Sequence, residues 1–202
     1  MADKNLLNKF LPEPCIDKVY HWLKLHQAVL RITAARMSKL GDYRPPHRGM
    51  PHRISVNHNL NHHEFLSTLL HEMAHLLCCE KYGRRVKPHG KEWKQAYKEL
   101  LPDICGPGIF PEDIEQAFAV FFHPRTSYRR GNEVLKLAFR KYDPGSDLKA
   151  IEEIPEGDSF IYHHRTFRKI QRVRTRYKCI CLNNNRLYSF SPLAQVMPQE
   201  TS

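Results

Sequence analysis

The feature that most constrains the fold is an apolar segment, residues 62–82, that has the periodicity and the boundary residues of one long helix. Asn61 can cap its start, Glu64 occupies the third helical position, and Gly83 is placed to end it. The apolar residues recur three and four positions apart: Leu66, Leu69, Leu70, Met73, Leu76 and Leu77. A helix with so broad an apolar face is buried on most sides, so we expect the rest of the fold to pack around it.

Two histidines and a glutamate lie in the middle of this helix, in the order His71-Glu72-Met73-Ala74-His75. Histidines four positions apart lie on one helix face, so both imidazoles can reach a tetrahedral Zn²⁺ at about 2.0–2.1 Å. Glu72 points beside the metal, where it can act as the general base toward a zinc-bound water. The chain holds 13 histidines, so a chance match is the alternative. However, two histidines and a glutamate are costly in an apolar helix unless they are used.

A catalytic zinc also needs a third protein ligand and an open fourth position. The metzincin class is excluded because Cys78 and Lys81 stand where that motif has glycine and histidine. The next histidine downstream is His89, which we predict to be the third metal ligand. The competing candidates are Glu92, Glu99, Cys78 and Cys79.

The surroundings of these residues resemble the SprT-like metallopeptidase family. The resemblance rests on residues 71–75, on Pro88-His89-Gly90-Lys91-Glu92-Trp93, and on shorter matches at 40–44, 54–57 and 191–194. It implies a zinc metalloendopeptidase with a zincin-like body, in which His71, His75 and His89 bind one zinc ion and Glu72 is the general base. Eukaryotic members cleave proteins trapped on DNA, so the resemblance implies a protein substrate and raises DNA, single-stranded or duplex, as a partner.

The chain departs from the family at its end, where many relatives carry a zinc ribbon made of two cysteine pairs. Here Cys179 and Cys181 are one residue apart and have no partner pair nearby. We therefore expect no second, structural zinc at this place.

The remaining patterns predict an α+β fold in two parts, with residues 1–145 as the metallopeptidase domain and 146–202 as a small basic β-rich extension. In the first part the patterns predict helices at 14–26, 91–101, 112–122 and 132–142, strands at 29–33 and 53–57, and a long turn region at 41–51. Pro102 is expected to stop the second of these helices. Residues 143–146 resemble a linker, and strands are expected at 160–162, 173–181 and 186–190.

The net charge of +11 suggests an acidic partner, and the excess lies near the end of the chain. Residues 159–198 contain no acid. We predict a nucleic-acid-binding surface formed by Arg165, Arg168, Lys169, Arg172, Arg174, Arg176 and Lys178. The last four alternate with less polar residues, so in one strand they would share a face. The alternative is a solvated strand face that keeps a small sheet soluble.

Peptide hydrolysis also requires an oxyanion stabiliser, for which Tyr43, Tyr97 and His123 are candidates. Two other functions stay open: a nucleic-acid-binding protein with a structural or vestigial zinc, and a zinc hydrolase acting on another bond. The first residues lack an apolar signal core, and no apolar run approaches the roughly 20 residues of a membrane span. The six cysteines form no disulfide framework. We therefore expect a cytoplasmic protein without a membrane partner.

Overall fold

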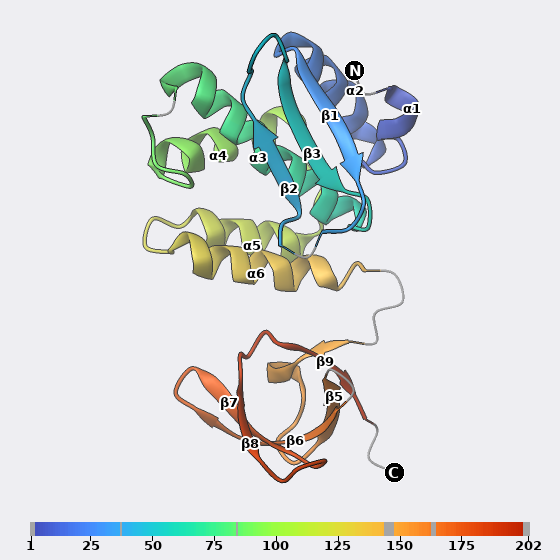
Figure 1. Cartoon of the computed structure of the whole chain (residues 1–202), viewed down its shortest axis with the longest axis vertical. Helices are drawn as coiled ribbons and strands as arrows, with labels where there is room; N and C mark the ends of the chain where they lie inside the picture. The colour runs from blue at the N-terminus through green and yellow to red at the C-terminus, as the bar shows by residue number, and fades with distance from the viewer. Residues whose placement is uncertain (1–2, 37, 84, 144–147, 163–164, 200–202) are drawn as a thin grey trace. The chain divides into compact units, whose positions relative to one another are not determined.

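The computed structural model describes residues 3–36, 38–83, 85–143, 148–162 and 165–199. The chain folds as two compact units, residues 1–143 and 144–202 (Figure 1). In the described residues the first unit contains α-helices and a sheet, and the second contains a sheet and a 3₁₀ turn. The predicted α+β class is confirmed, while the zincin-like arrangement stays a prediction. The expected linker at 143–146, and with it the boundary at 145, falls largely outside the described residues.

The first unit contains a three-stranded sheet of β1 (Ala28–Thr33), β2 (Gly41–Arg44) and β3 (His52–Asn57), in the order β1-β3-β2. β1 runs parallel to β3, and β2 runs antiparallel to it, with Gly41 opposite Val56. The interpretation of residues 41–51 as turn alone was therefore wrong. Glycine and prolines are dense there, but the ladder to β3 satisfies the β2 backbone on one side.

In the described part of the first unit six helices accompany this sheet: α1 (Lys4–Leu7), α2 (Glu13–Leu25), α3 (His62–Tyr82), α4 (Lys91–Ile104), α5 (Glu112–Phe122) and α6 (Tyr128–Arg140). α2 and α3 contact the strands directly. The predicted bounds of α3 are confirmed: the Asn61 Oδ1 atom accepts the Glu64 backbone N–H at 2.9 Å, and Gly83 follows the last turn. Its apolar residues form the centre of the core, and Leu66, Leu69, Leu70 and Met73 are fully buried.

Two helix boundaries differ from the prediction by more than two residues, and the ends of the first and last predicted helices differ by one or two. α4 passes through Pro102 and ends at Ile104, whose burial in the core favours the additional turn. α6 begins at Tyr128 instead of residue 132, because the Ser127 hydroxyl accepts the Arg130 backbone N–H and caps the helix there.

The second unit is one six-stranded sheet in the order β4-β9-β5-β6-β7-β8. Its strands are β4 (Lys149–Ala150), β5 (Ser159–Tyr162), β6 (Arg165–Val173), β7 (Arg176–Cys181), β8 (Leu187–Phe190) and β9 (Gln195–Pro198), with a 3₁₀ turn at Ile151–Glu153. It has its own apolar core, in which Cys179 and Cys181 are fully buried beside Phe160 and Phe167. Across the described residues, no helix has the length and apolar character needed to cross a bilayer.

Candidate metal centre

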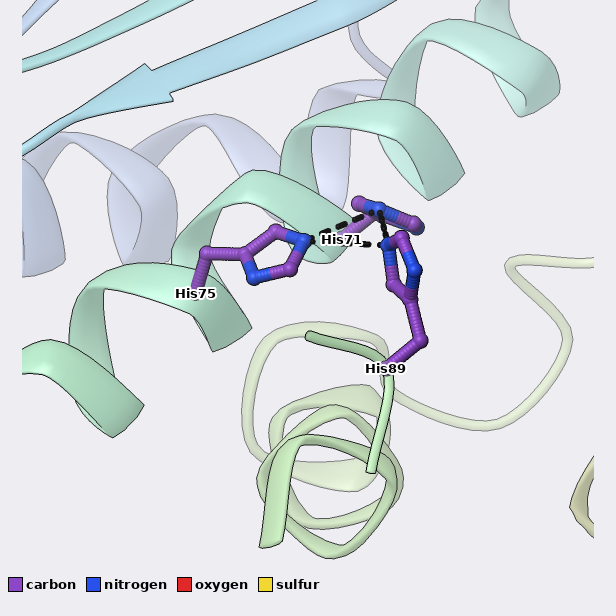
Figure 2. Close-up of side chains that lie close together, drawn as sticks. All are labelled: His71, His75 and His89. Atoms are coloured by element: carbon purple, nitrogen blue, oxygen red, sulfur yellow. Dashed lines mark hydrogen bonds between the residues drawn. The ribbon is translucent and has the colours of Figure 1, made fainter. Parts of the chain in front are cut away.

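Three imidazoles converge in the first unit, two from α3 and one from the loop before α4 (Figure 2). The Nε2 atoms of His71 and His75 are 3.3 Å apart, those of His75 and His89 are 3.2 Å apart, and those of His89 and His71 are 3.0 Å apart. Four-residue spacing on α3 places the first two rings on one face. His89 reaches them from a left-handed backbone conformation with a φ of 57°.

The donor set fits a zinc ion. A protonated ring nitrogen has no lone pair left to accept with, so three mutually close Nε2 atoms cannot satisfy one another by hydrogen bonds alone. A cation between them removes the conflict. Ligand atoms about 2.0–2.1 Å from a tetrahedral zinc stand about 3.3 Å apart, close to the observed triangle.

The three imidazoles are held in the neutral form that metal binding requires. Burial, followed by the proximity of His75 and His89, holds the pKa of His71 well below its usual value. Burial and then His89 lower the pKa of His75 to about 4, and burial lowers that of His89. At neutral pH protons therefore do not compete for these nitrogens.

Aromatic rings pack against the three imidazoles and hold their orientation. The Trp93 ring centroid lies 4.6, 5.4 and 4.8 Å from those of His71, His75 and His89, and its Nε1–H donates to the His71 carbonyl oxygen at 3.2 Å. Tyr128 stacks on His89 with 4.0 Å between centroids and 7° between planes. One buried indole thus contacts all three candidate ligands.

Glu72 is buried beside the triad, with 7% of its surface exposed. Burial raises its pKa to about 8, and the charge of Asp42 adds to the rise. Lys39, the backbone N–H of Tyr43 and Arg36 oppose it. A divalent cation held by the three imidazoles would favour the ionised form of this carboxylate.

The triad and Glu72 line a cleft of about 570 Å³. The β2 end of the cleft is formed by Leu40, Gly41 and Asp42, and the α6 side by Tyr128, Asn132 and Lys136. Within the described residues β2 pairs only with β3, so its other edge has no partner strand there. The cleft therefore combines a candidate metal site, a buried carboxylate and an unpaired strand edge.

The competing metal ligands do not join this group. Among the described residues, the cluster with metal-binding geometry consists of His71, His75 and His89 alone. Glu92 lies near Lys91, and Glu99 accepts the Gln95 amide at 2.7 Å on an exposed helix face. Cys78 is buried in the main core, with 5% exposure.

The three candidate oxyanion stabilisers are all engaged elsewhere or exposed. The Tyr97 hydroxyl donates to the Ser67 carbonyl oxygen at 3.0 Å, and the Tyr43 hydroxyl lies 2.9 Å from His52 Nδ1. His123 is exposed at the end of α5, where its Nδ1 accepts the Arg125 backbone N–H.

The predicted basic surface needs two corrections. Residues 173–181 are not one strand: β6 ends at Val173, Arg174 turns with a φ of 53°, and β7 starts at Arg176. A register shift between Lys169 and Gln171 pairs Arg172 with Tyr177. Arg172 therefore shares a face with Tyr177, opposite to the face that carries Arg176 and Lys178.

Lys169 is the second correction, because it is 3% exposed and cannot reach a phosphate backbone. Its ammonium donates to the carbonyl oxygens of Ile151, at 2.9 Å, and Ile154, and it lies over the Tyr177 ring. The remaining members of the predicted surface are exposed: Arg165, Arg168, Arg172, Arg174, Arg176 and Lys178.

Sequence reasoning overlooked Gly41 and Tyr128. A Cβ at position 41 would come within 2.7 Å of Glu72 Oε1, so only glycine fits there without a shift. Tyr128 follows Ser127, an N-cap residue type, and that signal could have placed it at the start of a helix. The sequence around each of these two residues does not indicate which residue it contacts in the fold.

Comparisons with known proteins converge on one family. Residues 18–104 match the SprT-like family model. A 46-residue stretch is 41% identical to Protein SprT of Pseudomonas fluorescens strain SBW25, and covers 21% of this chain and 28% of that protein. A 31-residue stretch is 58% identical to Protein SprT of Glaesserella parasuis serovar 5, and covers 15% and 19% of the two chains. The matches thus span less than a third of these relatives. No solved structure is significantly similar to the chain.

Proposed function

The chain carries a SprT-like domain at residues 18–104, and from this premise we propose that it is a zinc-dependent metallopeptidase. The observation that carries the proposal is the triangle of three neutral imidazoles next to the buried carboxylate of Glu72. His71, His75 and His89 would hold the ion. When bound, zinc supplies Lewis-acid polarisation and lowers the pKa of a coordinated water toward about 7.

The protein's own residues transfer the proton and hold the reacting groups in position. Glu72 accepts the proton of the attacking water and passes it to the nitrogen of the leaving amine. Its backbone partner at Tyr43 and the close approach of Gly41 hold the carboxylate in one place. Trp93 and Tyr128 keep the imidazoles oriented and exclude water from their outer faces.

The free edge of β2 supports a polypeptide as the substrate. An extended chain can add to an unpaired strand edge through backbone hydrogen bonds, without regard to its sequence. β2 borders the cleft that contains Glu72, so a strand added there would bring a peptide bond to the metal centre. This favours peptide hydrolysis over the hydrolysis of another bond, and flexible or unfolded proteins as substrates.

A structural zinc is the rival, and the cleft argues against it. Structural sites are closed by four protein ligands, whereas catalytic sites keep one position open. In the described residues the cluster supplies three ligands, and all three line the cleft.

Comparing the wild type with Glu72→Gln tests the proposal. Zinc content should stay near one ion per chain in both proteins, while cleavage of a flexible protein should fall by at least a hundredfold in the variant. Glu99→Gln, on the exposed face of α4, is the matched control and should retain full activity. Equal cleavage by the wild type and Glu72→Gln would contradict the proposed role of Glu72 as general base.

We further propose that the second unit binds DNA and that proteins held on DNA are among the substrates. The support is a group of exposed cations at positions 165, 168, 172, 174, 176 and 178, in a stretch without acids. Replacing Arg172, Arg174, Arg176 and Lys178 by Gln should weaken binding to single-stranded DNA. The slope of log affinity against log salt should fall by about 0.7 per lost phosphate contact.

The control replaces four exposed cations of the first unit, Lys9, Lys18, Arg31 and Lys98, by Gln and so has the same net charge. It should keep the salt slope. An equal loss of DNA affinity in both variants would show that binding depends on the net charge of the protein and not on a surface of the second unit. The six cysteines, all unpaired, support action in a reducing compartment such as the cytoplasm.

A further inference from the structure

Tyr128 occupies a position in the cleft that the mechanism above leaves without a chemical role. It is the first residue of α6, and the Ser127 cap fixes the start of that helix. Its ring is nearly parallel to His89 at 4.0 Å, and Trp93 contacts it edge-on at 5.7 Å. These two contacts hold the plane of the Tyr128 ring at the wall of the cleft.

This hydroxyl is free to donate a hydrogen bond. Within the described part of the chain, no side chain or backbone group pairs with the Tyr128 hydroxyl, although the residue is half-buried and lines the cleft. A phenol has an ordinary pKa of about 10, so the proton stays on the oxygen at neutral pH. The tyrosines considered from the sequence differ, because Tyr43 and Tyr97 both use their hydroxyls inside the protein.

We propose that the Tyr128 hydroxyl donates a hydrogen bond to the carbonyl oxygen of the scissile peptide bond as that oxygen becomes negatively charged. This inference rests on the proposed peptidase function. Water adds to the carbonyl carbon, the C=O π pair moves to the oxygen, and Glu72 takes the proton of the water. When the C–N bond breaks, the oxygen pair reforms the carbonyl and the amine nitrogen receives the proton. The Tyr128 proton is shared throughout and not transferred.

The chemistry of the cleft favours this role over packing alone. Stacking on His89 needs only the aromatic ring, which phenylalanine supplies equally well. Water can reach the Tyr128 hydroxyl in the open cleft, and a substrate oxygen that takes the place of this water completes the same hydrogen bond. A fixed donor of this kind contributes about 10²–10³-fold to the turnover of acyl-transfer enzymes.

The test compares wild type with Tyr128→Phe, which keeps the ring and removes only the O–H. We expect kcat for a flexible peptide to fall about 10²-fold with KM within twofold and zinc content unchanged. Tyr142→Phe is the matched control at the other end of α6: it loses a hydroxyl bonded to Asp113, outside the cleft, and should keep kcat.

A second readout does not depend on turnover. A phosphinic peptide carries a tetrahedral anion where the reacting carbonyl would be, and calorimetry should show its affinity falling with Tyr128→Phe by a factor similar to kcat. Adding Tyr128→Phe to Glu72→Gln should leave the affinity for the uncleaved substrate peptide unchanged. Unaltered kcat and phosphinate affinity would overturn the proposal, as would a loss fully explained by missing zinc or by KM. If the wild type binds the phosphinate through Tyr128 but cleaves no peptide, the peptidase proposal and the role of Tyr128 in peptide hydrolysis both fail, and Tyr128 remains only a donor to a bound tetrahedral anion. If the wild type cleaves peptides and Tyr128→Phe changes neither readout, the role of Tyr128 alone fails.

Discussion

Gly41 lies directly against the carboxylate of Glu72: a Cβ built at position 41 would meet Glu72 Oε1 at 2.7 Å and Glu72 Cγ at 2.9 Å. Real Cβ atoms do not approach heavy atoms so closely, so the edge strand β2 and helix α3 can share this contact only through glycine. The neighbouring Tyr43 backbone N–H bonds the same carboxylate. The strand that borders the cleft therefore also positions the carboxylate that we propose as the general base.

Gly41→Ala should reduce activity without removing the metal. The added methyl must displace either Glu72 or the β2 backbone, so we expect kcat/KM to fall at least tenfold while zinc content is unchanged. Gly106→Ala is the control, since a Cβ there meets nothing within 4 Å. Steady-state kinetics and metal analysis on both variants check this. Full activity of Gly41→Ala would show that the carboxylate position is not critical.

Trp93→Phe should weaken zinc binding. The substitution removes the N–H bond to the His71 carbonyl and part of the ring that supports all three imidazoles. Loss of a group that orients metal ligands typically costs 10–100-fold in affinity. Competition with a chelator measures it, and Trp22→Phe is the control because that indole packs on His26 away from the site. Equal zinc affinities in the two variants would contradict the supporting role.

The pH dependence of stability should carry the signature of Glu64. Burial, followed by the charge of Asp143, raises its pKa from 4.5 to about 7, against the opposing charges of Lys136 and Arg140. The folded state then binds this proton more tightly than the unfolded state, so the contribution of Glu64 to stability declines as pH rises from about 4.5 to 7.

Glu64→Gln removes that titration. Relative to the wild type, the variant should gain free energy of unfolding between pH 5 and pH 8, on the order of 1–3 kcal/mol after allowing for partial exposure. Denaturant unfolding at both pH values measures the difference. Glu115→Gln, on the exposed face of α5, should leave it unchanged. A parallel response of the wild type and Glu64→Gln would show that this carboxyl does not titrate as described.

Metal removal should destabilise the first unit. Zinc that binds only the folded chain adds about 4 kcal/mol at a thousand times its dissociation constant, and a chelator abolishes this gain. His89→Ala should show no zinc-dependent shift in the thermal midpoint, whereas His123→Ala, exposed just after α5, should keep the whole shift. A zinc-dependent shift that survives in His89→Ala would remove His89 from the ligand set.

The parts of the fold that the sequence predicts are those with local causes. The bounds of α3 follow from Asn61, Gly83 and the spacing of its leucines, and α5 follows from its own periodicity. β2 was missed because its four residues become a strand only by pairing with β3. Whether a chain segment pairs at a distance is not written in its own residues.

The candidate site divides in the same way. The helical spacing predicts His71 and His75 as a pair, and the structure brings His89 to them across 14 residues of chain. The contact of Gly41 with Glu72, the stacking of Tyr128 on His89 and the burial of Lys169 depend on which elements meet in three dimensions. The hairpin turn at Arg174 was hidden because an unbroken alternation of residues resembles one strand.

The backbone conformation of His89 bears on how the candidate metal centre would change in evolution. Its φ of 57° is a conformation that glycine adopts freely and that costs other residues about 1–3 kcal/mol. In a lineage released from the need for metal, replacing His89 by glycine would stabilise the apo fold and so be favoured as well as tolerated. Keeping histidine at this position therefore lowers the stability of the apo fold. In a homologue that no longer binds the metal, we expect His89 to be replaced before either histidine on α3.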